Sequence, residues 1–106
     1  MTIAKYRIQI PGKLLKGIEL TGDAWTLCII HVLKDGPLRF CGIQRTLGDV
    51  NPTTLANRLK KLEKNGLVER QEETMDKLSV TYSLTGKGRS VSPIINTIGT
   101  FAEANL

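Results

Sequence analysis

Residues 51–66 carry the most regular pattern in the chain, NPTTLANRLKKLEKNG. Asn51 is a favourable N-cap, and Pro52 has the φ angle that suits the first helical position. Asn65 followed by Gly66 suits a helix stop. The pattern therefore predicts a helix of about four turns from Pro52 to Asn65. Three leucines recur at helical spacing and are expected to form its buried side: Leu55, Leu59 and Leu62.

The opposite side of this helix is polar and basic. Short polar groups stand near its amino end and long cations follow: Thr53, Thr54, Asn57, Arg58, Lys60, Lys61 and Lys64. A helix fits the major groove of B-DNA, where short polar groups can contact base edges and cations can bind phosphates. In an arbitrary sequence such a side is more often the solvated face of an amphipathic helix. The elements on either side of this helix indicate whether its polar side binds DNA or is simply solvated.

Two helices are predicted near the amino end. Residues 13–20 show a brief apolar stripe at helical spacing, and Asp23 is a good cap for the helix that follows. Residues 24–34 are apolar almost all round a helical wheel, with Thr26 and His31 as the polar exceptions. Such a helix is expected at the centre of the domain.

A short helix and a turn are predicted directly before the basic helix. Residues 35–37, Asp-Gly-Pro, end the central helix, and residues 38–40 have room only for a very short strand. Residues 41–47 then suit a short helix, and Gly48-Asp49-Val50 form the turn that leads to Asn51.

A hairpin and a closing helix are predicted after the basic helix. Residues 67–73 and 77–84 have the character of strands, and the second alternates plainly between apolar and polar positions. Thr85 caps a last segment in which apolar residues follow helical spacing from Val91 to Ala102.

This order of elements is that of a winged helix-turn-helix. The fold class is α+β, mainly α, with a two-stranded wing hairpin and flanking N- and C-terminal helices. Residues 1–106 are expected to form a single domain in which residues 1–11 are an arm or a short strand. The basic helix follows a helix and a turn and precedes a hairpin. This position favours a DNA-binding face over a merely solvated face, with double-stranded DNA as the partner.

The charge distribution supports an anionic partner. Lys and Arg number 15 against 10 Asp and Glu, which gives the 106-residue chain a net charge of +5. Residues 51–70 and residues 1–22 each have a net charge of +3, and the rest of the chain sums to −1, so the positive charge lies in two local basic patches. The wing is less basic, because Glu72, Glu73 and Asp76 surround a single cation, Lys77. Either the wing tip barely touches DNA or Lys77 alone does, and this acidic wing leaves open a winged-helix module that binds a protein instead of DNA.

Several separated motifs resemble one family over residues 12–104, the HxlR-type branch of MarR-like bacterial transcriptional regulators. They are Trp25-Thr26-Leu27 through Gly36, Arg39-Phe40, Leu55 with Arg58-Leu59, Leu62-Glu63 through Gly66-Leu67-Val68, and Tyr82-Ser83-Leu84-Thr85 with Gly88. The resemblance implies a homodimer, built by the first and last helices, that binds a palindromic operator and commonly represses. It also implies that Thr53, Thr54, Asn57 and Arg58 lie near the bases and that Lys61 contacts a phosphate.

The last helix independently predicts association. Its apolar stripe of Ile94, Ile95, Ile98 and Phe101 exceeds what a small winged domain can cover by itself. We expect this stripe to meet its symmetry mate.

The two cysteines leave a sensor as an alternative. Cys28 and His31 are three residues apart on the central helix and Cys41 follows, which keeps a thiol-responsive or metal-responsive regulator as the alternative interpretation. Buried, inert cysteines are the expectation, and no cofactor or metal is predicted. Many relatives carry a redox-sensing cysteine at the position of Gly12, and its absence argues against that particular switch.

Other classes of protein are disfavoured. His31 is the only histidine, and the chain shows no phosphate-binding glycine loop, carboxylate pair or nucleophile triad, so an enzyme is not expected. The longest apolar run is far short of the ~18 residues that span a bilayer. No signal peptide is recognised, and a cytoplasmic protein is predicted.

Overall fold

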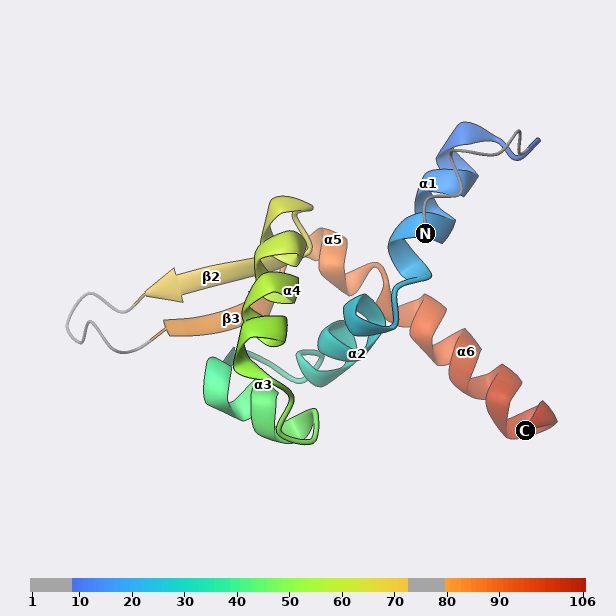
Figure 1. Cartoon of the computed structure of the whole chain (residues 1–106). Coiled ribbons are helices and arrows are strands. Elements are labelled where there is room, and N and C mark those ends of the chain that lie inside the picture. Colours follow the sequence, from blue (N-terminus) through green and yellow to red (C-terminus); the bar gives the residue numbers. More distant parts are fainter. Residues whose placement is uncertain (1–8, 73–79) are drawn as a thin grey trace.

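The computed structural model describes residues 9–72 and 80–106, which are mostly helical (Figure 1). The elements follow in the order α1 (Gly12–Thr21), α2 (Ala24–Val32), β1 (Leu38–Arg39), α3 (Phe40–Thr46), α4 (Pro52–Lys64), β2 (Val68–Glu72), β3 (Val80–Leu84), α5 (Gly86–Arg89) and α6 (Ser92–Asn105). This order confirms the predicted winged helix-turn-helix.

The hydrophobic core is aliphatic and lies where α2, α3 and α4 meet the base of the hairpin. Its members are Ile29, Ile30 and Leu33 from α2 and its end, Ile43 from α3, Leu55, Leu59 and Leu62 from α4, and Leu67, Val68, Leu84 and Val91. The three leucines predicted as the buried side of the basic helix are all 1 % exposed or less. Burial of one side of α4 leaves its other side outside the core.

Both ends of α4 form as the sequence predicts. The Asn51 side chain accepts hydrogen bonds from the backbone N–H groups of Thr53 at 2.9 Å and Thr54 at 3.3 Å. The first N–H groups of a helix have no carbonyl acceptor within the helix, and the Asn51 side chain supplies one for these two. At the other end Gly66 has a φ of +74°, the left-handed conformation that ends helices.

The turn between α3 and α4 is tightly closed. Gly48 and Asp49 both have positive φ angles, +75° and +58°. The Gln44 side chain donates to the Val50 carbonyl at 2.9 Å, and the Asp49 N–H donates to the Gln44 carbonyl at 3.0 Å. These bonds fix the angle at which α4 leaves α3.

The sheet has one strand more than the predicted hairpin. Strands β2 and β3 are antiparallel, with Val68 opposite Leu84 and Glu72 opposite Val80. The short β1 also pairs with β3, which places β3 in the middle of a three-stranded sheet. The wing is therefore joined to the segment that enters α3. The predicted strand ends near residues 73 and 77, and Lys77 itself, lie outside the described residues, as does most of the predicted arm.

The closing segment is two helices where one was expected. Thr85 caps α5 by accepting a hydrogen bond from the Gly88 N–H at 3.0 Å. The chain then turns through Ser90, and Pro93 starts α6, because proline suits only the first turn of a helix.

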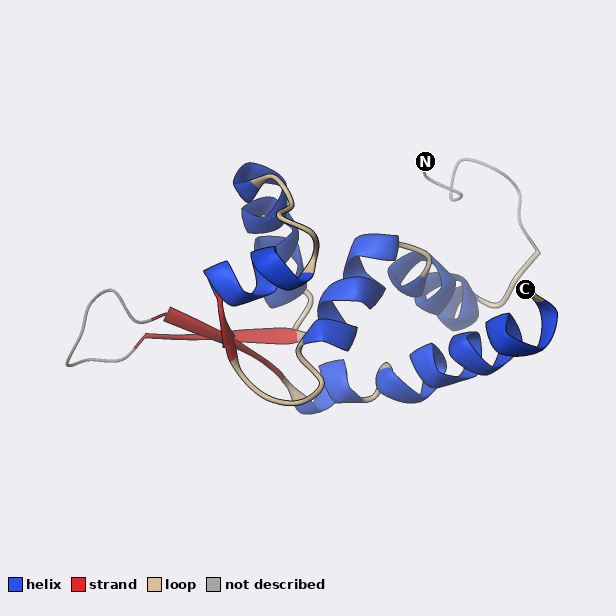
Figure 2. Cartoon of the chain, turned by 90° about the horizontal axis from the view of Figure 1, so that it is seen from below, coloured by secondary structure: helices blue, strands red, loops and turns tan. Residues whose placement is uncertain are grey.

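The wing and α6 lie at opposite ends of the molecule (Figures 1 and 2). The radius of gyration is 15.4 Å, whereas a compact domain of this length has about 13 Å. Large apolar side chains are exposed on the two flanking helices: Leu14 and Ile18 on α1, and Ile94, Ile98 and Phe101 on α6. Ile95 departs from the prediction for this stripe, because it packs against the chain's own core.

The expectation of buried cysteines is wrong. Cys28 and Cys41 are both exposed free thiols, and His31 is exposed as well. Within one chain, the core covers α2 only on the side of Ile29 and Ile30. The helix is apolar on its other sides too, but those sides are not fully buried.

Candidate nucleic-acid interface

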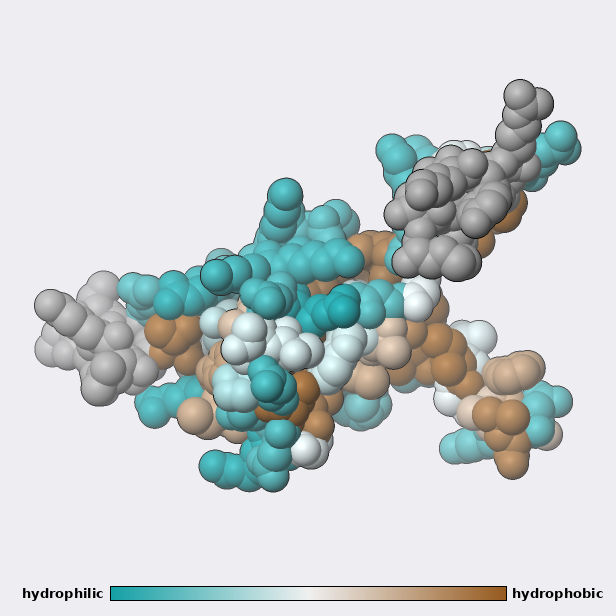
Figure 3. Space-filling view, in the orientation of Figure 1, coloured by the Kyte–Doolittle hydropathy of each residue, from teal (hydrophilic) through white to brown (hydrophobic). Residues whose placement is uncertain are grey.

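The polar side of α4 faces solvent. Thr53, Asn57, Lys60, Lys61 and Lys64 are exposed, and Thr54 and Arg58 are half-buried at its edge. In Figure 3, hydrophilic residues lie over β2 and the upper part of α4, and residues of intermediate hydropathy lie over the lower part of α4. Seven of the eight residues predicted for DNA binding thus share one surface, and the eighth, Lys77, falls in a part of the chain that the structure does not describe.

A hollow of about 340 Å³ opens along one edge of this surface. It is lined by Thr54, Asn57, Arg58 and Lys61, which come from successive turns of α4. A hydroxyl, an amide and two cations are groups that bind the phosphates and sugars of nucleic acids.

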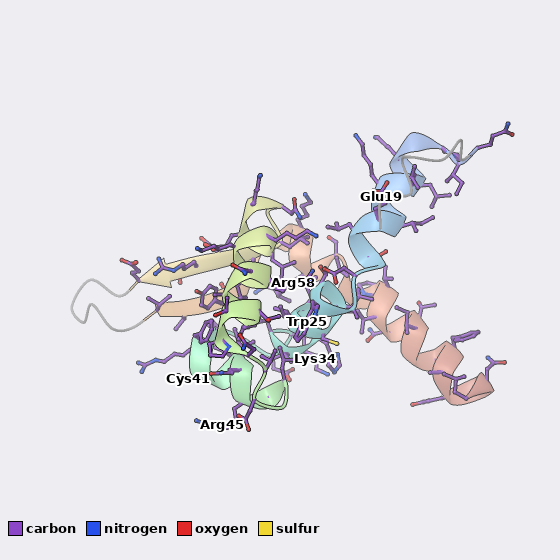
Figure 4. The ribbon with its side chains drawn as sticks, viewed as in Figure 1. Glu19, Trp25, Lys34, Cys41, Arg45 and Arg58 are labelled. Atoms are coloured by element: carbon purple, nitrogen blue, oxygen red, sulfur yellow. The ribbon has the colours of Figure 1, made fainter. Side chains whose placement is uncertain are left out.

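Arg58 is held at the hollow by an ion pair with the cap of another helix. Its Nη1 donates to Oδ2 of Asp23 at 3.1 Å, and the two side chains are 37 % and 22 % exposed. Figure 4 shows Arg58 on the side of α4 that faces α2. An ion pair this accessible to water adds only about 0–1 kcal/mol to stability, so its main effect is to fix where the guanidinium lies.

Asp23 is itself fixed. Its Oδ1 accepts from the Trp25 N–H at 3.2 Å, and its Oδ2 accepts from the Thr26 hydroxyl at 3.2 Å, in addition to Arg58. The carboxylate therefore caps α2, as the sequence predicts, and also joins α2 to α4.

The base of the wing adds little positive charge. Arg70 pairs with Glu72 at 2.7 Å along β2. Hydrogen bonds to Glu72 and to Tyr82 raise the pKa of Arg70 above its ordinary value, so this cation stays charged but is engaged. The nearby Glu69 is exposed. These contacts concern the base of the wing, whereas the prediction for the wing tip and Lys77 falls on residues 73–79, outside the described residues.

The ion pair between Asp23 and Arg58 is the feature of the site that sequence reasoning missed. Asp23 was assigned as a cap and Arg58 as a DNA contact, but 35 residues separate them. No local periodicity links two positions so far apart along the chain.

Within residues 9–72 and 80–106, no three His, Cys, Asp or Glu side chains gather in a way that could hold a metal ion. No helix in that part of the chain is long and apolar enough to span a bilayer.

The comparisons with known proteins agree on one family. The model described as HxlR-like helix-turn-helix matches residues 20–106. The HTH-type transcriptional regulator YodB of Bacillus subtilis is 38 % identical over 91 residues, which cover 86 % of this chain and 81 % of that protein. The uncharacterized HTH-type transcriptional regulator BH0655 of Halalkalibacterium halodurans is 39 % identical over 79 residues, covering 74 % and 70 %.

Solved structures show the same fold. The reduced form of YodB from B. subtilis superposes with a TM-score of 0.81 at 36 % identity, covering 92 % of this chain and 95 % of that one. The oxidized form of the redox regulator HypR gives a TM-score of 0.79 at 26 % identity, covering 89 % and 97 %.

Proposed function

The chain belongs to the HxlR-like helix-turn-helix family of transcriptional regulators, and we propose that it binds duplex operator DNA as a homodimer through α4. It acts by occupying DNA in the cytoplasm and performs no catalysis of its own. Repression follows where the occupied site overlaps a promoter.

One observation carries this proposal: the polar, basic side of α4 lies open while its leucine side is buried. Thr53 and Asn57 stand in the amino-terminal half, the part of a recognition helix that approaches base edges. Lys60, Lys61 and Lys64 follow at positions suited to the phosphates along the groove.

The exposed apolar residues of α1 and α6 support a dimer. Phe101 is 61 % exposed, Leu14 56 % and Ile98 47 %. Exposed apolar side chains gathered on two projecting helices are typical of a surface that another chain covers. A two-fold axis at these helices gives two copies of α4, which fit a palindromic operator with half-sites about 34–36 Å apart.

Selection of bound sequences from random duplexes, followed by titration at two salt concentrations, tests the proposal. A palindromic consensus is expected, and affinity should fall by about 10³-fold or more between 50 and 200 mM salt if at least six phosphates are neutralised. Absence of binding at low salt, together with capture of a stoichiometric protein partner, would instead favour a protein-interaction module.

The exposed thiols favour a second function, a thiol-controlled regulator. Cys28 and Cys41 are both reachable by solvent, and exposure is one of the conditions for a reactive thiol. Diamide takes two electrons and two protons from a pair of thiols and leaves a disulfide. We expect diamide to weaken DNA binding of the native chain and to have no effect once the responsible cysteine is replaced, as Cys28→Ser or Cys41→Ser. Equal responses of all three proteins would exclude this control.

A further inference from the structure

The residues of the DNA-binding surface lie at different angles around α4. At 100° per residue, Asn57 stands about 165° from the centre of the leucine side, whereas Arg58 stands only about 65° from it. Arg58 is half-buried, in keeping with that position. When α4 enters a groove with its open side first, Arg58 faces the ridge beside the groove, where the backbone phosphates lie, and not the base edges.

The ion pair keeps Arg58 at that edge. Asp23 accepts three hydrogen bonds, of which the one from the Trp25 N–H caps α2 and another comes from the Thr26 hydroxyl, so its carboxylate cannot follow Arg58 into the groove without loss of the cap. A guanidinium has five N–H donors in a rigid fork. One of them is bound to Asp23, and the remainder can serve a second anion at the hollow.

We infer that Arg58, positioned by Asp23, and Lys61 bind one backbone phosphate of the DNA in the hollow on the α2 side of α4, which leaves base readout to Thr53 and Asn57. This inference rests on the proposed function and deepens it. The sequence leaves two roles open for Arg58, a position near the bases and a contact with a phosphate, and this inference assigns Arg58 to the phosphate.

The charges at the hollow match this ligand. Arg58 and Lys61 supply two positive charges and Asp23 one negative charge, so the cluster carries a single net positive charge. A phosphodiester carries a single negative charge. Thr54 borders the same hollow and adds a neutral hydroxyl that can donate to a phosphate oxygen.

The test measures binding of Arg58→Ala to the selected operator and to an unrelated duplex, at 50 and 200 mM salt. We expect affinity for both duplexes to fall by about tenfold with their ratio unchanged, because a phosphate contact carries no sequence information. The salt slope should fall by about 0.9, which makes the loss about 3.5 times larger at 50 mM than at 200 mM. The control is Lys34→Ala, which removes an exposed cation beyond the end of α2 and should leave the slope unchanged.

A loss of discrimination would overturn the inference. If Arg58→Ala lowers operator affinity while affinity for the unrelated duplex persists, Arg58 contacts bases, and the proposed function stands without the inference. If native protein binds neither duplex at low salt, both fail. Arg58→Lys guards against misfolding of the alanine variant: it keeps the charge and should keep the specificity ratio, whereas a guanine contact through the guanidinium fork would lose it.

Asp23→Asn tests the positioning role, since asparagine still caps a helix but carries no charge. With Asp23 present, removal of Arg58 should cost about tenfold in affinity. In the Asp23→Asn background the same removal should cost about threefold or less, because a free guanidinium must be ordered on binding. An equal or larger cost in that background would show that Asp23 only competes with DNA for Arg58.

Discussion

Gly88 sits where a side chain has no room. A Cβ at this position would overlap the carbonyl oxygen of Leu67 and press on the side chain of Leu84. Its N–H also donates to the Thr85 hydroxyl, and that hydroxyl donates to the Gly66 carbonyl at 2.6 Å. The close approach lets α5 pack directly against the segment that follows α4.

Gly88→Ala should therefore destabilise the fold by about 2 kcal/mol or more, as overpacking against backbone does. Gly86→Ala, in the same short helix, is the matched control. Nothing lies within 4 Å of a Cβ at Gly86, so this change should be neutral or slightly stabilising. Urea unfolding midpoints measure both, and equal midpoints would contradict the packing at Gly88.

We expect Asn57 and Lys61 to have different roles, base readout for Asn57 and phosphate binding for Lys61. Both are exposed on α4 and line the same hollow. Asn57→Ala should lose discrimination at particular base pairs, by about 1–3 kcal/mol, while Lys61→Ala should weaken all sequences about equally. Competition binding with a panel of single-base operator variants measures the difference. Indistinguishable profiles would refute these two assignments.

At the scale of elements, the start of α4 depends on one side chain. Asn51 accepts from two N–H groups of the first turn. Asn51→Ala should cost about 1 kcal/mol of unfolding free energy, and Asn51→Ser, which retains a cap, should cost much less. Thermal unfolding of the two variants checks this. If alanine and serine behave alike, the cap does not stabilise α4.

The elements that follow from local patterns are those that sequence predicts well. Asn51, Pro52 and Gly66 mark the ends of α4 by their own backbone preferences, and the leucine spacing gives its buried side. The pairing of β1 with β3 joins Leu38 to Tyr82 across 44 residues, and no local signal encodes it. The same holds for the bond between Asp23 and Arg58, which depends on how two finished helices pack.

The exposure of Cys28 could not be predicted for a different reason. A helical wheel that is apolar all round indicates complete burial but does not say which chain supplies the cover. Helix α2 contacts α1, α3, α4 and α6 of its own chain and still leaves Cys28 and His31 accessible.

At the scale of the whole molecule, substitutions on the projecting helix α6 test whether the chain forms a dimer. Figure 3 shows apolar residues on α6, away from the polar surface of α4. Phe101→Glu should shift the protein from dimer to monomer at micromolar concentration, because it places a charge in an apolar interface. Asn96→Glu, also exposed on α6 but on its opposite side, should leave the dimer intact. Light scattering measures the mass, and a monomeric native protein would contradict the dimer.

The angle at which α6 leaves α5 sets the position of the far tip of α6. At 1.5 Å per residue the 14 residues of α6 extend about 21 Å, so a tilt of about 10° at Val91 displaces the far tip by about 4 Å. That displacement is close to the 3.4 Å step between stacked base pairs. Val91 packs in the core and Ile95 packs against it, and both resist such a tilt, so in a pair of chains joined at these tips the separation of the two copies of α4 is held to within roughly one step of the duplex.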